Sequence, residues 1–346
     1  MLPDHIWNAF ASHYDARLGG AGTPPVRLSE VRQAVPTQLP GYYYQHPKLR
    51  AGNGPRILYQ GDMTQDVIVL THGFTDSPFY MQDVAARFFE VGCNVILPLL
   101  PAHGLKEPDE AIRQEELDNR WKDTIDASVA VARLLGQRVS IGGFSTGGVL
   151  SLNKILRHSE MIDGGLFLFS AALSLGRLAD KVGNSEIAEW IVGFFLDRTA
   201  VIGEGPDPYK YPILPASVAS EVVEIIQESN AILQDVKTLP HPVFAAHSQH
   251  DATAEIQGVI DFLSQHVSPE KQLFFPIEDK KVMHATLPLK TAVPIDLTLV
   301  APNEKSPKQR KIKQDDWLKH VAANPHFEEM MNKAIHFFQQ KVEGGM

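Results

Sequence analysis

Cysteine is almost absent from the sequence, because Cys93 is the only one in 346 residues. A single thiol excludes a disulfide framework and a zinc site built from cysteine ligands. Cys93 precedes an apolar stretch that is typical of a buried strand, so we expect it to be a small core residue. The chain is long enough, as one large domain or two ordinary ones, to bury a sizeable core without crosslinks.

Positive charge and long apolar runs are also scarce. The formal net charge is −9, which argues against nucleic acid as a partner because phosphate binding needs a basic surface. No apolar run approaches the length of a bilayer span, so we expect no integral membrane segment. The first residues lack a basic stretch followed by an apolar one, so we expect no signal peptide and a cytoplasmic protein. The glycines before Ser145 form neither G-x-G-x-x-G nor a P-loop, so we expect no cofactor.

From residue 56 onward the sequence alternates between short apolar runs and amphipathic stretches. The alternation predicts a mostly parallel sheet with helices on both faces, which is an α/β fold. The expected strands are residues 56–59, 67–70, 94–97, 139–142, 165–169, 242–246 and 271–275. The expected helices between and after them are residues 80–90, 118–135, 147–157, 253–266 and 327–342. Residues 1–55 are predicted to be a structural N-terminal extension.

Two segments depart from this alternation. Residues 173–240 contain helical patterns at 185–196 and 218–231 but no strand pattern. This predicts a helical cap inserted between two parts of the core, 56–172 and 241–346. Residues 286–325 are long, polar and rich in Lys and Pro, which is more typical of a surface excursion or a partly mobile loop than of a second site.

A G-x-S-x-G sequence, residues 143–147, joins the expected strand 139–142 to the helix that follows it. At such a junction the serine, Ser145, lies on a strained turn that raises its hydroxyl above the sheet. Glycine is needed on both sides because a side chain there would collide with the neighbouring strand or helix. The position therefore favours Ser145 as a nucleophile, against the alternative of a simple turn residue.

Acyl transfer from serine also needs a base, a carboxylate that orients it and donors for the oxyanion. Asp251 follows the strand 242–246 and His284 follows the last strand, so both belong to the edge that Ser145 occupies. Their competitors by residue type are Glu255, Glu278 and Asp279 for the carboxylate, and His247, His250 and His266 for the base. A metal site formed by His247, His250 and Asp251 is a further alternative, although no third strand supplies evident ligands.

The oxyanion donors are expected from a His-Gly turn. Thr71-His72-Gly73-Phe74 comes directly after the strand 67–70, so the backbone N–H of Phe74 can face the nucleophile together with that of Thr146. His72 and His103 are predicted to bond loop backbone near the site and not to take part in catalysis.

Several of these pieces together resemble an α/β-hydrolase of the carboxylesterase and monoacylglycerol-lipase type, including its serine aminopeptidase-like branch. The matching sequences are Leu70-Thr-His-Gly-Phe-Thr75, Leu97-Pro-Leu-Leu-Pro-Ala-His-Gly104, Trp121-Lys-Asp, Gly143-Phe-Ser-Thr-Gly147 and the neighbourhoods of Asp251 and His284. The resemblance implies an α/β-hydrolase fold with Ser145 as nucleophile, His284 as base and Asp251 as orienting carboxylate. Asp76, Pro101 and the long segment after His284 depart from the family pattern and bear on the substrate more than on the chemistry.

The sequence thus predicts a serine hydrolase for carboxylic esters, acting on small-molecule esters through an acyl-enzyme. Apolar residues in 186–196 suggest a short- to medium-chain acyl group or a monoglyceride. An amide or peptide hydrolase is the alternative, and it would need an acidic group such as Glu186, Glu189 or Glu204 to hold the substrate amine. A binding protein without turnover is a third reading.

Overall fold

The computed structural model describes residues 1–20, 24–30, 39–114, 116–174, 205–212, 214–300 and 303–344. Within them a nine-stranded sheet has the order β1-β2-β3-β5-β4-β6-β7-β8-β9. The strands are β1 (Val26–Arg27), β2 (Gly41–Tyr43), β3 (Arg56–Leu58), β4 (Thr64–Thr71), β5 (Asn94–Leu97), β6 (Gly136–Phe144), β7 (Leu166–Phe169), β8 (Val243–Ser248) and β9 (Gln272–Ile277). A strand forms at every position where the sequence predicts one.

The sheet is parallel from β5 through β4, β6, β7 and β8 to β9 and antiparallel at its other end. There β3 pairs antiparallel with β5, β2 with β3, and β1 with β2. Every strand of the parallel part therefore ends at the same edge, so that residues far apart in the sequence are brought together there.

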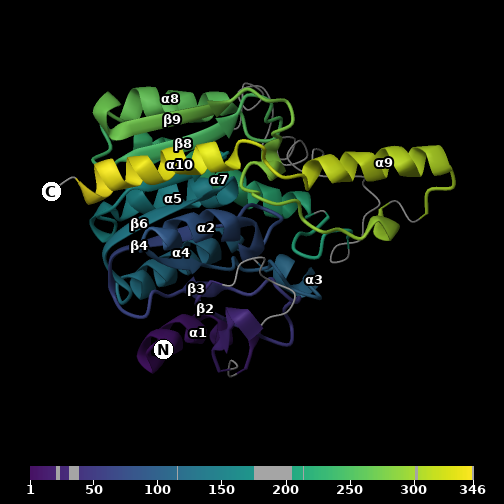
Figure 1. Ribbon diagram of the computed structural model, residues 1–346, viewed down its shortest axis with the longest axis horizontal. Coiled ribbons are helices and arrows are strands. Elements are labelled where there is room, and N and C mark those ends of the chain that lie inside the picture. The colour runs from purple at the N-terminus through teal and green to yellow at the C-terminus, as the bar shows by residue number, and fades with distance from the viewer. Residues whose placement is uncertain are drawn as a thin grey trace.

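The helices cover both faces of this sheet (Figure 1). They are α1 (Asp4–Leu18), α2 (Gln82–Glu90), α3 (Asp109–Ile112), α4 (Leu117–Ala132), α5 (Thr146–Arg157), α7 (Ala216–Leu233), α8 (Ile256–His266), α9 (Pro307–His320) and α10 (Phe327–Phe337). The shorter turns are η1 (Leu28–Glu30), η2 (Pro78–Met81), η3 (Ser159–Met161), η4 (Pro269–Lys271), η5 (His284–Thr286), η6 (Leu297–Leu299) and the π-helical η7 (Phe338–Glu343).

Two apolar clusters form the core, one on each face of the sheet. In β4, Val67 and Val69 belong to the cluster with α1, α4, α5, α7 and α8, while Ile68 and Leu70 belong to the cluster with α2 and α10. Successive side chains of a strand point to opposite faces, so a run of apolar residues fills both clusters. This continuous apolar pattern is the mark of a sheet that is buried on both sides.

The N-terminal extension is part of this core. Residues 41–43 add a strand beside β3, and α1 buries Trp7, Phe10 and Tyr14 in the first cluster. The Tyr44 hydroxyl donates to Asp15 Oδ1 at 2.7 Å. The described residues among the first 55 thus extend the sheet and cover part of one face.

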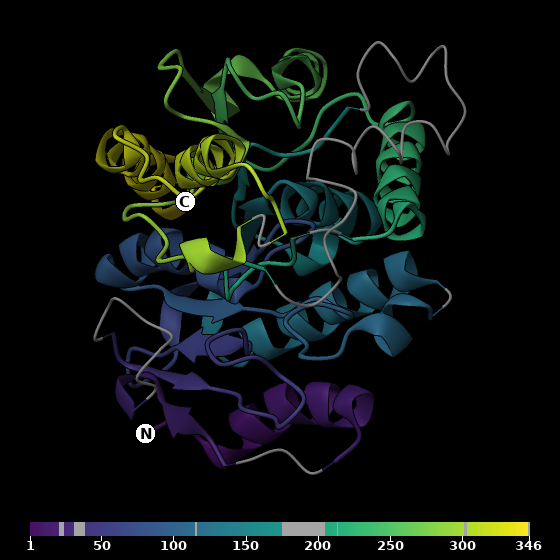
Figure 2. The same ribbon diagram turned by 90° about the vertical axis from the view of Figure 1, so that its right-hand side faces the viewer.

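The two segments that depart from the strand and helix alternation, 173–240 and 286–325, agree only in part with the expectations from the sequence. Helix α7 forms at the expected residues 218–231, whereas the expected helix at 185–196 lies outside the described residues. The expectation of a loop over 286–325 is wrong at residues 307–320, which form α9, while the absence of buried residues in α9 agrees with a surface excursion. Helix α9 extends from the body of the protein on the side away from both termini (Figure 1), which is the side that faces the viewer in Figure 2. In the part of the chain that is described, no helix has the length and apolarity to cross a membrane.

Candidate active site

Ser145 lies on a sharp turn between β6 and α5. Its φ of 52° and ψ of −116° are strained values for a residue with a side chain. A Cβ atom on Gly143 would lie 2.5 Å from the Thr71 carbonyl oxygen, and one on Gly147 would lie 2.1 Å from it. Only glycine at both positions lets the turn pack this closely against β4, which is the reason expected from the sequence.

The structure brings Ser145, His284 and Asp251 together from three strand ends. Ser145 Oγ lies 3.0 Å from His284 Nε2, and Asp251 Oδ2 lies 2.6 Å from His284 Nδ1. All three side chains are buried, and the Phe144 ring packs against the His284 ring with 4.8 Å between centroids. This is the hydrogen-bonded chain that an acyl-transfer triad requires.

Asp251 has more partners than the sequence indicates. Its Oδ1 accepts from the backbone N–H groups of Thr253 and Ala254, both at 2.9 Å. Its Oδ2 lies 3.3 Å from His247 Nε2, which also contacts the Ala254 carbonyl oxygen at 2.8 Å. Burial opposes the charge of Asp251, but the imidazoles of His284 and His247 hold the pKa of this carboxyl well below its ordinary value.

His247 is the residue whose place the sequence reasoning missed, since it appears there only as a rival base or a metal ligand. It is fully buried near the end of β8, and its Nε2 faces Asp251 Oδ2, the same carboxylate oxygen that His284 Nδ1 contacts. The available signal is its position four residues before Asp251, where the chain turns back at the strand end. His250 contacts the Glu278 carbonyl oxygen at 2.9 Å, and His266 the Val236 carbonyl oxygen at 2.9 Å, so both lie away from Ser145.

The loop after β4 is held by two buried histidines. His72 Nε2 accepts from the Leu100 N–H at 3.1 Å, so the proton is on Nδ1, which donates to the Gly73 carbonyl oxygen at 2.8 Å. Burial lowers the pKa of His72 to about 3 and also lowers the pKa of His103, whose Nε2 contacts the Phe74 carbonyl oxygen. Both imidazoles therefore bond loop backbone, as expected from the sequence.

The hydrogen bond from His72 Nδ1 to the Gly73 carbonyl oxygen fixes the direction in which the Phe74 N–H points. In a trans peptide the N–H points opposite to the C=O, so the N–H of Phe74 points away from His72. Among the described residues, neither this N–H nor that of Thr146 donates a hydrogen bond. Both groups thus keep the donor capacity that an oxyanion site requires.

Residues 205–212 are fastened to the same loop by buried polar contacts. Lys210 Nζ lies 3.0 Å from Asp76 Oδ1, with exposed side-chain fractions of 10% and 2%, and the Tyr211 N–H donates to the Thr75 carbonyl oxygen at 2.8 Å. The Tyr80 hydroxyl donates to Asp207, whose pKa is raised by burial. Asp76, a departure from the family pattern, is therefore one half of a buried ion pair.

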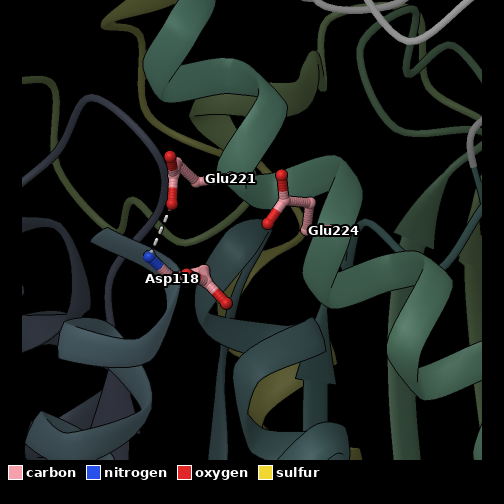
Figure 3. Close-up of side chains that lie close together, drawn as sticks. All are labelled: Asp118, Glu221 and Glu224. Carbon is pink, nitrogen blue, oxygen red and sulfur yellow. Dashed lines mark hydrogen bonds between the residues drawn. The ribbon is translucent and has the colours of Figure 1, made fainter. Parts of the chain in front are cut away.

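One group of acidic side chains is close enough to hold a metal ion in the described part of the chain. The carboxylate oxygens of Asp118, Glu221 and Glu224 lie within 4.8 Å of one another (Figure 3). Lys122 Nζ is already 2.9 Å from Asp118 Oδ2, and Glu221 accepts from the Asp118 N–H at 2.9 Å. Two of the three carboxylates are thus already engaged within the protein. Glu186, Glu189 and Glu204, the candidates for holding a substrate amine, lie outside the described residues.

The residues of this site lie within a segment that matches a known protein family. The profile of the serine aminopeptidase (S33) family matches residues 62–287, which include Ser145, Asp251 and His284. A thermostable monoacylglycerol lipase of Bacillus sp. (strain H-257) is 23% identical over 210 residues, which are 60% of this chain and 78% of that protein.

Solved structures show the same fold. A structure from a study of the metagenome-derived lipolytic enzymes LipS and LipT has a TM-score of 0.59 and 16% identity, with coverage of 85% of this chain and 100% of that one. A soluble variant of monoglyceride lipase from Saccharomyces cerevisiae has a TM-score of 0.50 and 15% identity over 86% of this chain and 99% of that one. The family match ends at residue 287, so α9 lies beyond it.

Proposed function

The chain belongs to the serine aminopeptidase (S33) family of α/β-hydrolases, and from this premise we propose that it hydrolyses carboxylic esters through an acyl-enzyme on Ser145. The observation that carries the proposal is the contact of Ser145 Oγ with His284 Nε2 at 3.0 Å, continued from His284 Nδ1 to Asp251 at 2.6 Å. The esterase or lipase character of the family agrees with it.

In the first half-reaction Ser145 Oγ attacks the acyl carbon while His284 Nε2 takes its proton. The N–H groups of Phe74 and Thr146 stabilise the oxyanion, and Asp251 holds the imidazole tautomer and stabilises the imidazolium. The C–O bond to the alcohol then breaks, and His284 gives the proton to the leaving oxygen. In the second half-reaction His284 activates a water molecule that attacks the acyl-enzyme, and the acid leaves with Ser145 reprotonated.

The substrates we propose are short- to medium-chain acyl esters or monoglycerides. The support is the similarity to proteins named as monoacylglycerol lipases and the apolar sequence of residues 186–196. In this proposal residues 173–240 form a cap between the two parts of the core, 56–172 and 241–346. An amide or peptide hydrolase is the second candidate, because the family takes its name from serine aminopeptidases.

The decisive test is intact mass spectrometry after exposure to a fluorophosphonate. We expect one adduct on the wild-type protein and none on Ser145→Ala, with hydrolysis of p-nitrophenyl esters reduced on the order of 10⁵-fold or more in the variant. Ser151→Ala is the matched control, because Ser151 is also buried on α5 but donates to the Gly147 carbonyl oxygen at 2.7 Å. Esterase activity retained in Ser145→Ala would refute the proposal.

A substrate panel separates the two candidates. Esters of increasing acyl length and aminoacyl p-nitroanilides are compared by kcat/KM on the same preparation. Ester turnover that changes with acyl length supports the first candidate, whereas faster cleavage of the anilides supports the second.

A further inference from the structure

Helix α9 and the residues just before it carry a concentration of positive charge that contrasts with the acidic chain. Residues 305–313 contain five Lys or Arg residues and no Asp or Glu, in a protein with a formal net charge of −9. We call this stretch the basic arm; its charged members are Lys305, Lys308, Arg310, Lys311 and Lys313. Lys305 and Lys308 are exposed and form no ion pair within the described residues, so their charge faces solvent. Lys311 Nζ lies 2.6 Å from Asp315 Oδ1, and Lys313 Nζ lies 3.9 Å from Glu304 Oε2, so these two charges have acidic neighbours.

The basic arm is at the end of α9 that lies farthest from the sheet. In Figure 1 the helix extends away from the body, on the side opposite the N and C termini, and returns to it at its C-terminal end. That end packs against η5, the turn that begins with His284. With a rise of about 1.5 Å per residue, the first turn of α9 stands roughly 20 Å from this contact. The arm therefore projects from the edge of the sheet that carries Ser145 and His284.

The C-terminal end of α9 packs against η2, the turn that follows the His72-Gly73-Phe74 loop. Trp317 and Val321 pack with Phe79, Tyr80 and Tyr209 in a separate apolar cluster. The Val293 N–H also donates to the Val321 carbonyl oxygen at 2.9 Å. These contacts fix the direction of α9, and therefore the position of the basic arm relative to Ser145.

The polar surface of α9 favours binding by charge over binding by apolar contact. None of its residues is buried, and its exposed surface is polar except at isolated positions such as Ile312, which is 58% exposed. A helix without an apolar face binds by charge and does not insert into a bilayer. Each Lys or Arg side chain close to an anionic lipid surface is attracted by the negative surface potential, and this attraction needs no insertion.

We propose that the basic arm docks this protein on an anionic phospholipid surface with its active-site edge turned toward the lipid. The acidic remainder of the chain is repelled by such a surface, so approach through the arm is the favourable orientation. Lipid is favoured over nucleic acid because a lipid surface also holds acyl esters, and in this respect the inference rests on the proposed function. The arm lies beyond the matched family segment, so it is a feature of this chain that the family match does not cover.

Vesicle sedimentation tests the docking without turnover. Full-length Ser145→Ala is mixed with vesicles of phosphatidylcholine alone or of phosphatidylcholine and phosphatidylglycerol. We expect binding to the mixed vesicles only, weakened by added salt. The triple variant Lys305→Gln/Lys308→Gln/Lys311→Gln should bind about 100-fold more weakly, at about fivefold for each charge. The matched control is Arg27→Gln/Lys333→Gln/Lys341→Gln, whose exposed residues lie on β1, α10 and η7 and should leave binding unchanged.

Equal binding of the two triple variants overturns the proposal, and so does equal binding to both kinds of vesicle. Tighter binding to duplex DNA than to the mixed vesicles overturns it in favour of a nucleic-acid partner. Hydrolysis of a water-soluble ester, measured with Ser145 intact, should be the same in both triple variants and in wild type. Absence of that hydrolysis in all three refutes the proposed function, while the vesicle result still decides the docking.

Discussion

Asp251, which follows β8, and Asp207, in the segment that packs on the loop after β4, are both buried carboxylates in contrasting surroundings. Asp251 faces two imidazoles and two backbone N–H groups, and its pKa is held well below the ordinary value. Asp207 faces the Tyr80 hydroxyl and the Tyr209 N–H, with Lys210 as a weaker influence, and burial raises its pKa. Burial alone therefore does not determine the charge of a carboxyl; the number and sign of its partners do. The first environment suits a group that stabilises an imidazolium, and the second suits a structural anchor.

Removing the charge of Asp251 should have the largest effect. In Asp251→Asn the amide group can donate to His284 Nδ1, which forces the ring proton onto Nε2, where it faces Ser145. The imidazole can then no longer accept the serine proton, and we expect kcat for ester hydrolysis to fall about 10⁴-fold. Steady-state kinetics with a p-nitrophenyl ester measures this, and circular dichroism checks that the fold is intact.

His247→Gln is the matched control for that variant. His247 Nε2 lies 3.3 Å from Asp251 Oδ2, which also faces His284, while Oδ1 accepts from two backbone N–H groups, so the loss of His247 removes one of several partners of the carboxylate. We expect a reduction of kcat of about 10- to 100-fold, the scale of one hydrogen bond to a charged group. A reduction as large as that of Asp251→Asn would mean that the carboxylate is held by His247 and not by the backbone N–H groups.

For the buried ion pair of Asp76 and Lys210 the expected effect is on stability. Lys210→Met leaves Asp76 buried without its 3.0 Å partner, which should lower the free energy of unfolding by about 3–5 kcal/mol. Urea unfolding followed by tryptophan fluorescence gives this value. The double variant Asp76→Asn/Lys210→Met removes the unpaired charge as well, and it should recover most of the loss. A double variant as unstable as the single one would show that the lysine acts through contacts other than Asp76.

The parallel strands and the meeting of Ser145, His284 and Asp251 could be predicted from the sequence. Each strand is a short apolar run bounded by turn residues, and in a parallel sheet all such runs end at one edge. A residue that closely follows a strand is therefore placed in space by local pattern alone. This is why Asp251 and His284 could be separated from their competitors, and why His72 could be identified as a support for the loop.

Contacts between distant segments could not be predicted in this way. Tyr80 and Asp207 are 127 positions apart, and nothing in the local pattern of either indicates the other. Helix α9 could not be predicted because it is mostly polar and its few apolar residues do not recur with helical periodicity. Its start carries a recognisable signal, Ser306 as N-cap followed by Pro307, but its position depends on the packing of Trp317 in a small separate cluster.

The pH dependence of stability should show the contrast between Asp207 and Asp251 most directly, although with the smallest effect. The raised pKa of Asp207 means that the folded protein binds this proton more tightly than the unfolded chain does. Its contribution to stability is therefore lost as the pH rises from the ordinary value of 3.8 through the raised one. For Asp251 the pKa is lowered, so the contribution is present above 3.8 and is lost as the pH falls below it. Urea unfolding of Asp207→Asn and Asp251→Asn across this range should give differences from wild type that change with pH in opposite directions. Differences that change in the same direction would mean that the two carboxyls titrate alike and that their partners do not distinguish them.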